Sequence, residues 1–196
     1  MKSSTSHLFI PLVLMLALSL PATAQRLYKG QKAFGISAGF VDNYDLQKRD
    51  NSGYFGRFEY SAVTKSRNLW LFGVQGSVKY YEYLRSLAAV TQFVGDIGYQ
   101  VPVLHNYRYS YALSFQLGVN GGYEAVSADD REFPNGAIVD ARDRFLYGGY
   151  VGGNFKVYLS NRTALFVDFK ERFLNGSDIA NFHSNLGIGI QIMLAN

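Results

Sequence analysis

The sequence predicts an all-β protein, an eight-stranded antiparallel transmembrane β-barrel of the outer-membrane type, preceded by a cleaved signal peptide. Three observations predict this fold class. Apolar and polar side chains alternate along most of the chain, the chain begins with a secretory signal, and no apolar run after Leu20 could form a membrane-spanning helix. Because successive side chains of a strand point to opposite faces, each strand gains one face suited to lipid and one suited to a hydrogen-bonded interior.

Residues 1–24 have the composition of a Sec-type signal peptide. Lys2 supplies positive charge, residues 8–20 form an apolar run, and Ala22 to Ala24 make a small-residue cleavage site. We expect cleavage after Ala24, which leaves residues 25–196 as a single barrel domain. The alternative is an uncleaved anchor, but the run is shorter than the roughly 20 residues that a spanning helix needs. The chain has no cysteine, so we expect neither a disulfide nor a lipoprotein anchor.

The composition favours a membrane barrel over a soluble domain. The chain is 48% hydrophobic and 16% aromatic but only 17% charged, whereas about 25% charged residues are usual in soluble domains. The basic residues are scattered rather than gathered into a stripe, so we expect no direct nucleic-acid binding. Cofactors are not expected either.

Eight segments alternate over roughly the 9 to 11 residues with which a tilted strand crosses a bilayer. In the first four, the apolar faces are Phe34, Ile36, Ala38 and Phe40 of 33–41; Tyr54, Phe58, Tyr60 and Ala62 of 54–63; Trp70, Phe72, Val74, Val78 and Tyr80 of 70–80; and Phe93, Ile97 and Tyr99 of 92–99. The facing positions carry mainly Gly, Ser, Gln and charged residues. These four segments are therefore predicted strands.

The second half of the chain repeats the pattern. The apolar faces are Tyr111, Leu113, Phe115, Leu117 and Val119 of 110–120; Phe145, Tyr147, Val151, Phe155, Val157 and Leu159 of 145–159; Leu165, Val167, Phe169 and Phe173 of 165–173; and Phe182, Leu186, Ile188, Ile190, Ile192 and Leu194 of 182–194. Glu171 falls on an apolar face. We expect it either to lie at the membrane edge, where a charge costs little, or to mark a bulge that shifts the register.

The connections support this count. With a periplasmic N-terminus, the periplasmic turns would be 64–68, 101–107 and 160–162, and the outer connections would be 42–53, 82–86, 127–143 and 175–181. Longer connections thus fall mostly on one rim, as in outer-membrane barrels. The longest, 127–143, has a solvated, turn-forming composition.

A secreted soluble barrel with its apolar face turned inward is the main alternative fold, because periodicity does not say which face is inside. Two features favour the membrane. The polar face has few charges, although a solvated exterior would be rich in Lys and Glu. Aromatic residues lie toward the segment ends, where interfacial girdles belong: Trp70, Tyr80, Tyr99, Tyr111 and Tyr147.

The inward face carries a nearly balanced set of charges. Eight strands enclose a space just wide enough for side chains, so unpaired charges there would be unfavourable. We therefore predict a structural network of ion pairs and hydrogen bonds that fixes the register, with a proton or ion path as the alternative. Its predicted members are Arg57, Glu59, Lys79, Asp96, Glu124, Lys156, Asp168, Lys170, Arg172 and His183.

Catalysis is not expected. His183 and Ser184 loosely resemble the His and Ser of outer-membrane lipid A deacylases, which need both side chains on one face and a carboxylate to orient the imidazole. Adjacent residues of a regular strand face opposite sides, so only a bulge could bring these two together. No second histidine is placed to complete a metal site.

Four motifs, in order, resemble the TraO family of conjugative transposon proteins: QRLYKGQK at 25–32, DRFLYGG at 143–149, ERFLNGS at 171–177, and FH at 182–183 with LGIG at 186–189. The resemblance covers nearly the whole mature chain and is weakest in the middle loops. It departs at Asn175, a position that is often aromatic in the family.

The resemblance implies a structural outer-membrane component of a conjugative DNA-transfer apparatus and no enzyme. Such a protein would contact outer-membrane lipid and other conjugal-transfer envelope proteins. We expect the 127–143 loop and the 25–32 segment to be its contact surfaces. The alternative function is that of a general adhesion or protective surface barrel.

Overall fold

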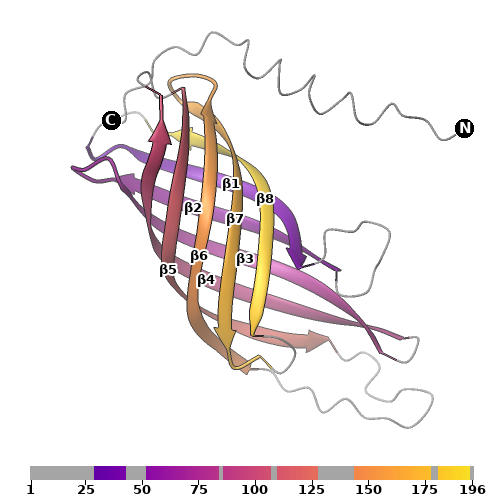
Figure 1. Ribbon diagram of the computed structural model, residues 1–196. Coiled ribbons are helices and arrows are strands. Elements are labelled where there is room, and N and C mark those ends of the chain that lie inside the picture. Colours follow the sequence, from indigo (N-terminus) through magenta and orange to yellow (C-terminus); the bar gives the residue numbers. More distant parts are fainter. Residues whose placement is uncertain are drawn as a thin grey trace, which may run out of the picture.

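The computed structural model describes residues 29–42, 52–83, 86–106, 110–127, 144–177 and 181–194 (Figure 1). The expected signal peptide and residues 128–143 of the predicted loop lie outside these ranges. The strands are β1 Lys32–Asp42, β2 Ser52–Val63, β3 Leu69–Tyr83, β4 Ser86–His105, β5 Tyr111–Ser127, β6 Arg144–Tyr158, β7 Thr163–Asn175 and β8 Phe182–Met193. No helix among the described residues is long and apolar enough to cross a membrane.

The eight strands form one closed antiparallel barrel in chain order, which confirms the predicted fold class. Closure is made by β1 and β8, which pair from Ala33 with Met193 to Val41 with Asn185. Each strand therefore has a partner on both sides, and the ladder hydrogen bonds satisfy the backbone groups that lipid could not.

The apolar face of the barrel is on the outside. Ile36 and Ile188 are 62% and 64% exposed, whereas Arg57 and Lys170 on the inward faces are 4% and 1% exposed. A soluble barrel would have the reverse arrangement, so that alternative is wrong. Paired aromatic side chains lie near both ends of the outer face, as interfacial girdles do. The rings of Trp70 and Tyr99 are 5.0 Å apart at one end, and those of Tyr123 and Phe145 are 5.5 Å apart at the other.

Several strands are longer than the alternation predicted, and β4 gains the most residues. The predicted turn 101–107 is wrong, because β4 continues to His105 through an irregular register between Pro102 and Leu104. Proline has no backbone N–H to donate, and a bulge is one of the few strand positions that tolerate it. At the other end, β3 continues to Tyr83 and pairs with Ser86 of β4, so the predicted 82–86 connection is also too long. As a result, β3 and β4 reach well past the end of β1 (Figure 1).

Glu171 lies on the outer face without any bulge. It pairs in register with Val151 of β6 and with Ser184 of β8, and the Ser184 hydroxyl donates a hydrogen bond to its carboxylate. The next outward pair toward the rim is Phe173 with Phe182, whose rings are 5.2 Å apart. Of the two expectations, the position beside an interfacial aromatic pair is therefore the correct one, and the bulge is wrong.

Inward aromatic side chains are a feature that the alternation did not predict. Tyr150 is buried, and its ring lies against the inner side of Gly118. A Cβ added at Gly118 would be 2.6 Å from this ring. Phe166 covers Gly189 in the same way, with a ring atom 2.5 Å from an added Cβ. The inward glycines thus leave the space that these large rings fill, which helps to pack so narrow a barrel.

Candidate functional site in the barrel lumen

All ten residues of the predicted network lie on the inner side of the barrel. Nine are buried, and Glu59 is half-buried. They form three levels: an outer rim, a central layer, and a level near the end where β1 begins and β8 ends. The ionisable groups are therefore in a narrow space where each charge needs a partner.

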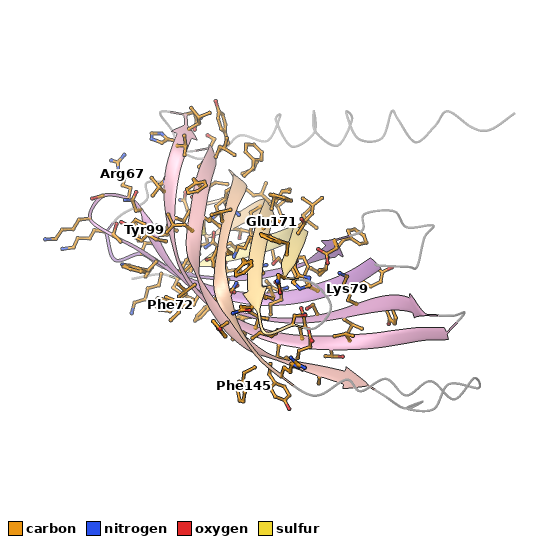
Figure 2. The ribbon with its side chains drawn as sticks, turned by 60° about the horizontal axis from the view of Figure 1, so that its bottom comes forward. Arg67, Phe72, Lys79, Tyr99, Phe145 and Glu171 are labelled. Carbon is orange, nitrogen blue, oxygen red and sulfur yellow. The ribbon has the colours of Figure 1, made fainter. Side chains whose placement is uncertain are left out.

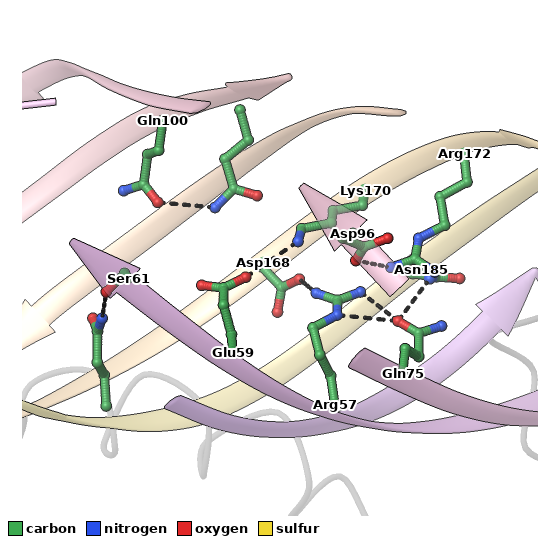
Figure 3. Close-up of polar contacts among 12 residues, drawn as sticks. Arg57, Glu59, Ser61, Gln75, Asp96, Gln100, Asp168, Lys170, Arg172 and Asn185 are labelled. Carbon is green, nitrogen blue, oxygen red and sulfur yellow. Dashed lines mark hydrogen bonds and ion pairs between the residues drawn. The ribbon is translucent and has the colours of Figure 1, made fainter. Parts of the chain in front are cut away.

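Arg57 is the centre of the middle layer (Figure 3). Its guanidinium donates to Asp168 Oδ2 at 2.5 Å, and its Nε donates to Gln75 Oε1 at 3.1 Å. The same amide oxygen accepts a hydrogen bond of 3.3 Å from Asn185. Arg57 on β2 and Asp168 on β7 are 111 residues apart in the chain. This ion pair therefore joins opposite walls of the barrel and fixes their relative positions.

Two further ion pairs complete the middle layer. Arg172 donates to Asp96 Oδ2 at 2.5 Å, and Lys170 lies 3.3 Å from Glu59 Oε2 (Figure 3). The Lys170 ammonium also lies 4.7 Å from the centre of the Tyr150 ring, within the range of a cation–π contact. Six of the ten predicted residues thus form three oppositely charged pairs in this layer.

Asp42 organises the outer rim, although the sequence reasoning missed it. Its carboxylate accepts a hydrogen bond from the Lys79 ammonium, lies 3.1 Å from His183 Nδ1, and accepts a bond of 2.7 Å from the backbone N–H of Ser184. Asp42 ends β1 with a φ of 63°, a left-handed conformation that breaks the alternation. Alternation therefore gave no signal for it.

Glu124 forms a second rim contact. It accepts hydrogen bonds from Gln92 at 2.7 Å and from the Ser177 hydroxyl at 3.0 Å. These bonds join β4, β5 and the segment that follows β7.

The opposite end of the lumen is closed by apolar side chains. Ala33, Ala112, Tyr158, Ala164 and Met193 form one buried cluster. Val63, Leu69 and Leu71 form another. Just inside them, Lys156 donates to Gln191, which in turn donates to the Ser61 hydroxyl at 2.8 Å.

The lumen is therefore filled with paired and packed side chains. Thirteen buried polar atoms, among them Tyr150 Oη, His183 Nε2 and Arg172 Nε, have no hydrogen-bond partner within the described part of the chain. An ion path would have to use these atoms and then cross the apolar clusters. A folded protein or a DNA strand could not follow it.

The residues that resembled a deacylase site are not brought together. The His183 ring lies inside, next to Asp42, whereas the Ser184 hydroxyl lies outside and donates to Glu171. Among the described residues, no group of three or more His, Cys, Asp or Glu side chains could hold a metal ion.

Solved structures with a similar fold include Ail, the attachment invasion locus protein of Yersinia pestis. In complex with the heparin analogue sucrose octasulfate, Ail aligns with a TM-score of 0.55 at 11% identity, over 85% of this chain and 100% of Ail. A second Ail structure gives 0.52 at 10% identity over the same shares. The N-terminal barrel of Pseudomonas aeruginosa OprF gives 0.44 at 10% identity, over 85% of this chain and 100% of that domain. At such identities Ail shows the fold alone.

The comparison with curated proteins gives no match. The family model "Conjugative transposon protein TraO" matches residues 28–194, from just before β1 to just after β8. The match includes every strand of the barrel and the whole lumen network. The chain belongs to the TraO family of conjugative transposon proteins.

Proposed function

We propose that this protein is a structural component of the conjugative DNA-transfer apparatus. In this proposal the protein lies in the outer membrane, where it anchors or organises the mating machinery. The observation that carries the proposal is the filled lumen. Because Arg57, Asp168, Asp96 and Arg172 occupy the middle of the barrel, DNA cannot pass through it, and the contribution to transfer must come from the surfaces.

The outer-membrane location is supported by the closed barrel and by its apolar exterior. The heparin analogue in the Ail complex is a ligand of that protein and is not carried over to this chain, because only the fold is similar. The function of a general adhesion or protective barrel therefore has no observation of its own in its favour.

Deletion of the gene tests the proposal. We expect the transfer frequency of the element to fall while growth of the donor is unchanged, and we expect the full chain supplied in trans to restore transfer. A deletion strain that transfers normally would contradict the proposal. A strain that transfers normally but loses surface adhesion or envelope resistance would instead indicate the general surface barrel.

We also propose that the barrel has no lipid-modifying activity, because the His183 ring and the Ser184 hydroxyl lie on opposite sides of β8. Mass spectra of lipid A from cells that overproduce the protein should match those from cells without it. Loss of an acyl chain from lipid A would contradict this proposal.

A further inference from the structure

One end of the barrel carries a basic collar, formed by Lys29, Lys32, Lys65, Arg67 and Arg162. All five are exposed. They lie where β1 begins and in the β2–β3 and β6–β7 connections, the end that faces the periplasm in the proposed orientation. The described residues of this end, 29–32, 63–69, 104–106, 110–112, 158–163 and 192–194, include no acidic side chain.

Backbone hydrogen bonds bring the collar residues together on neighbouring strands. Gly30, next to Lys29, donates to Val63 O at 2.9 Å, just before the turn that carries Lys65. Lys32 O accepts from the N–H of Leu194 at 2.8 Å. Arg162 O accepts from Met193 at 2.8 Å. The positive charges therefore follow the rim from β7 through β8 and β1 to β3.

The β2–β3 turn holds its part of the collar in a defined conformation. Thr64 donates to Asn68 O at 2.8 Å, and Arg67 donates to Thr64 O at 3.2 Å. Arg67 has a φ of 62°, the left-handed geometry that closes this tight turn. Figure 2 shows Arg67 at the opposite end of the barrel from Lys79.

The segments between the strands differ in charge. In the sequence, the segments that join β1 to β2, β3 to β4, β5 to β6 and β7 to β8, residues 43–51, 84–85, 128–143 and 178–180, contain eight acidic and five basic side chains. Mixed signs with an acidic excess are common for solvated loops, whereas a rim of one sign raises the local potential and attracts partners of opposite charge. The basic collar is therefore better suited than the segments of mixed charge to bind a particular partner.

The position of the collar favours a protein over the membrane as its partner. Lys65, Arg67 and Arg162 lie in turns beyond the strand ends, and the buried cluster around Tyr158 and Met193 closes the lumen beneath them. The collar thus borders a closed surface that faces along the barrel axis. Lipid headgroups surround the outside of the barrel wall, where Lys32 lies on the outer face of β1, but they do not cover the end of the barrel that the three turn residues border.

We propose that the basic collar docks an acidic face of a periplasmic protein of the transfer apparatus. This inference rests on the proposed function and names the surface through which it acts. Charges at the rim of an interface mainly set the association rate and the choice of partner, so the contact is expected to weaken steeply with salt.

The test uses the full-length protein in donor cells, with a photo-crosslinking amino acid at Ser66, between the two charged residues of the turn. We expect a crosslink to an acidic segment of a protein encoded with the transfer apparatus. The double variant Lys65→Glu with Arg67→Glu should lower the crosslink yield and the transfer frequency about tenfold. Lysine substitutions in the crosslinked acidic segment should restore both.

Two controls separate charge from other effects. Lys65→Arg with Arg67→Lys keeps the charge and should behave as the wild type. Lys48→Glu with Arg49→Glu makes the same charge change in the segment between β1 and β2 and should leave the Ser66 crosslink unchanged. A heat-modifiable gel shift should show that every variant is folded.

Three results would overturn the inference. The first is a normal crosslink and normal transfer for Lys65→Glu with Arg67→Glu, while gene deletion still abolishes transfer; the proposed function would then stand without this surface. The second is a crosslinked segment that is not acidic. The third is that the same double variant keeps the normal crosslink but is less stable than the wild type in vesicles of anionic lipid and not in neutral vesicles. That result would mean that the collar binds lipid headgroups. If gene deletion itself leaves transfer intact, the proposed function fails and the inference fails with it.

Discussion

The pair of Arg57 and Asp168 offers the sharpest test of the lumen network. Both side chains are 2% exposed, and they join β2 to β7 across the barrel. Removal of one partner from a buried ion pair leaves an uncompensated charge and costs about 3 to 5 kcal/mol, whereas replacement of both by apolar side chains of similar size is often nearly neutral. We therefore expect Arg57→Met and Asp168→Leu each to lower the free energy of unfolding by about 4 kcal/mol.

The double variant should recover most of that loss and unfold within about 1 kcal/mol of the wild type, which corresponds to a coupling energy of about 7 kcal/mol. Gln75 would still have a partner, because Asn185 donates to the same oxygen. The assay is reversible urea unfolding of the barrel in lipid vesicles. With a slope of about 2 kcal/mol per molar urea, each single variant should shift the midpoint by about 2 M.

Arg162→Met is the control, since this exposed arginine lies in a turn and its loss should change the free energy of unfolding by no more than about 0.5 kcal/mol. Two outcomes would refute the reasoning. Single variants as stable as the wild type would mean that the pair does not hold the walls together. A double variant that loses the sum of the two single effects would mean that the two side chains act independently.

Three other predictions concern packing, conduction and orientation. Gly118→Ala should destabilise the barrel by about 1 to 3 kcal/mol, because the added Cβ would lie 2.4 Å from a backbone oxygen. Gly56→Ala should be neutral or slightly stabilising in the same urea assay, because its added Cβ would meet nothing within 4 Å and would face an outer depression of about 680 Å³. Equal losses of unfolding free energy for the two glycine variants would contradict this account of the packing. In planar bilayers the wild type should show no stepwise ion current, whereas Tyr158→Ala, which opens the apolar cluster, should show a measurable current. A conducting wild type would favour the ion path. Fluorescence of Trp70, the single tryptophan, should be quenched more by lipids brominated near the headgroup than by lipids brominated near the chain end, and the reverse order would place this rim inside the hydrocarbon.

Alternation predicted the strands and the two faces well, because the orientation of a side chain in a strand depends only on its position along the strand. The stretch at 182–194 illustrates this: Ile188 and Ile190 are exposed on the outer face, and His183 and Gln191 are buried inside, as the period of two requires. The same local property placed all ten predicted lumen residues on the inner side.

Strand ends were harder to predict, because they depend on partners rather than on period. Residues 101–105 extend β4 only because β5 is long enough to pair with them beyond the irregularity at Pro102. Asp42 joined the lumen contacts through a left-handed backbone conformation, which no periodic pattern encodes. In the sequence, the glycines of the inner face are simply small residues among polar ones. Only the packed barrel shows that they leave room for the rings of Tyr150 and Phe166.

The sequence by itself determined the fold class, the apolar exterior and the charged interior, since each follows from a repeat of two residues within single strands. Only the tertiary structure decided which charges meet. Arg57 pairs with Asp168 of β7, and not with Glu59 two residues away on its own strand, because closure of β1 on β8 sets the register of all eight strands and places β2 and β7 across the lumen from each other. That register is a property of the whole closed sheet, and no single strand contains it.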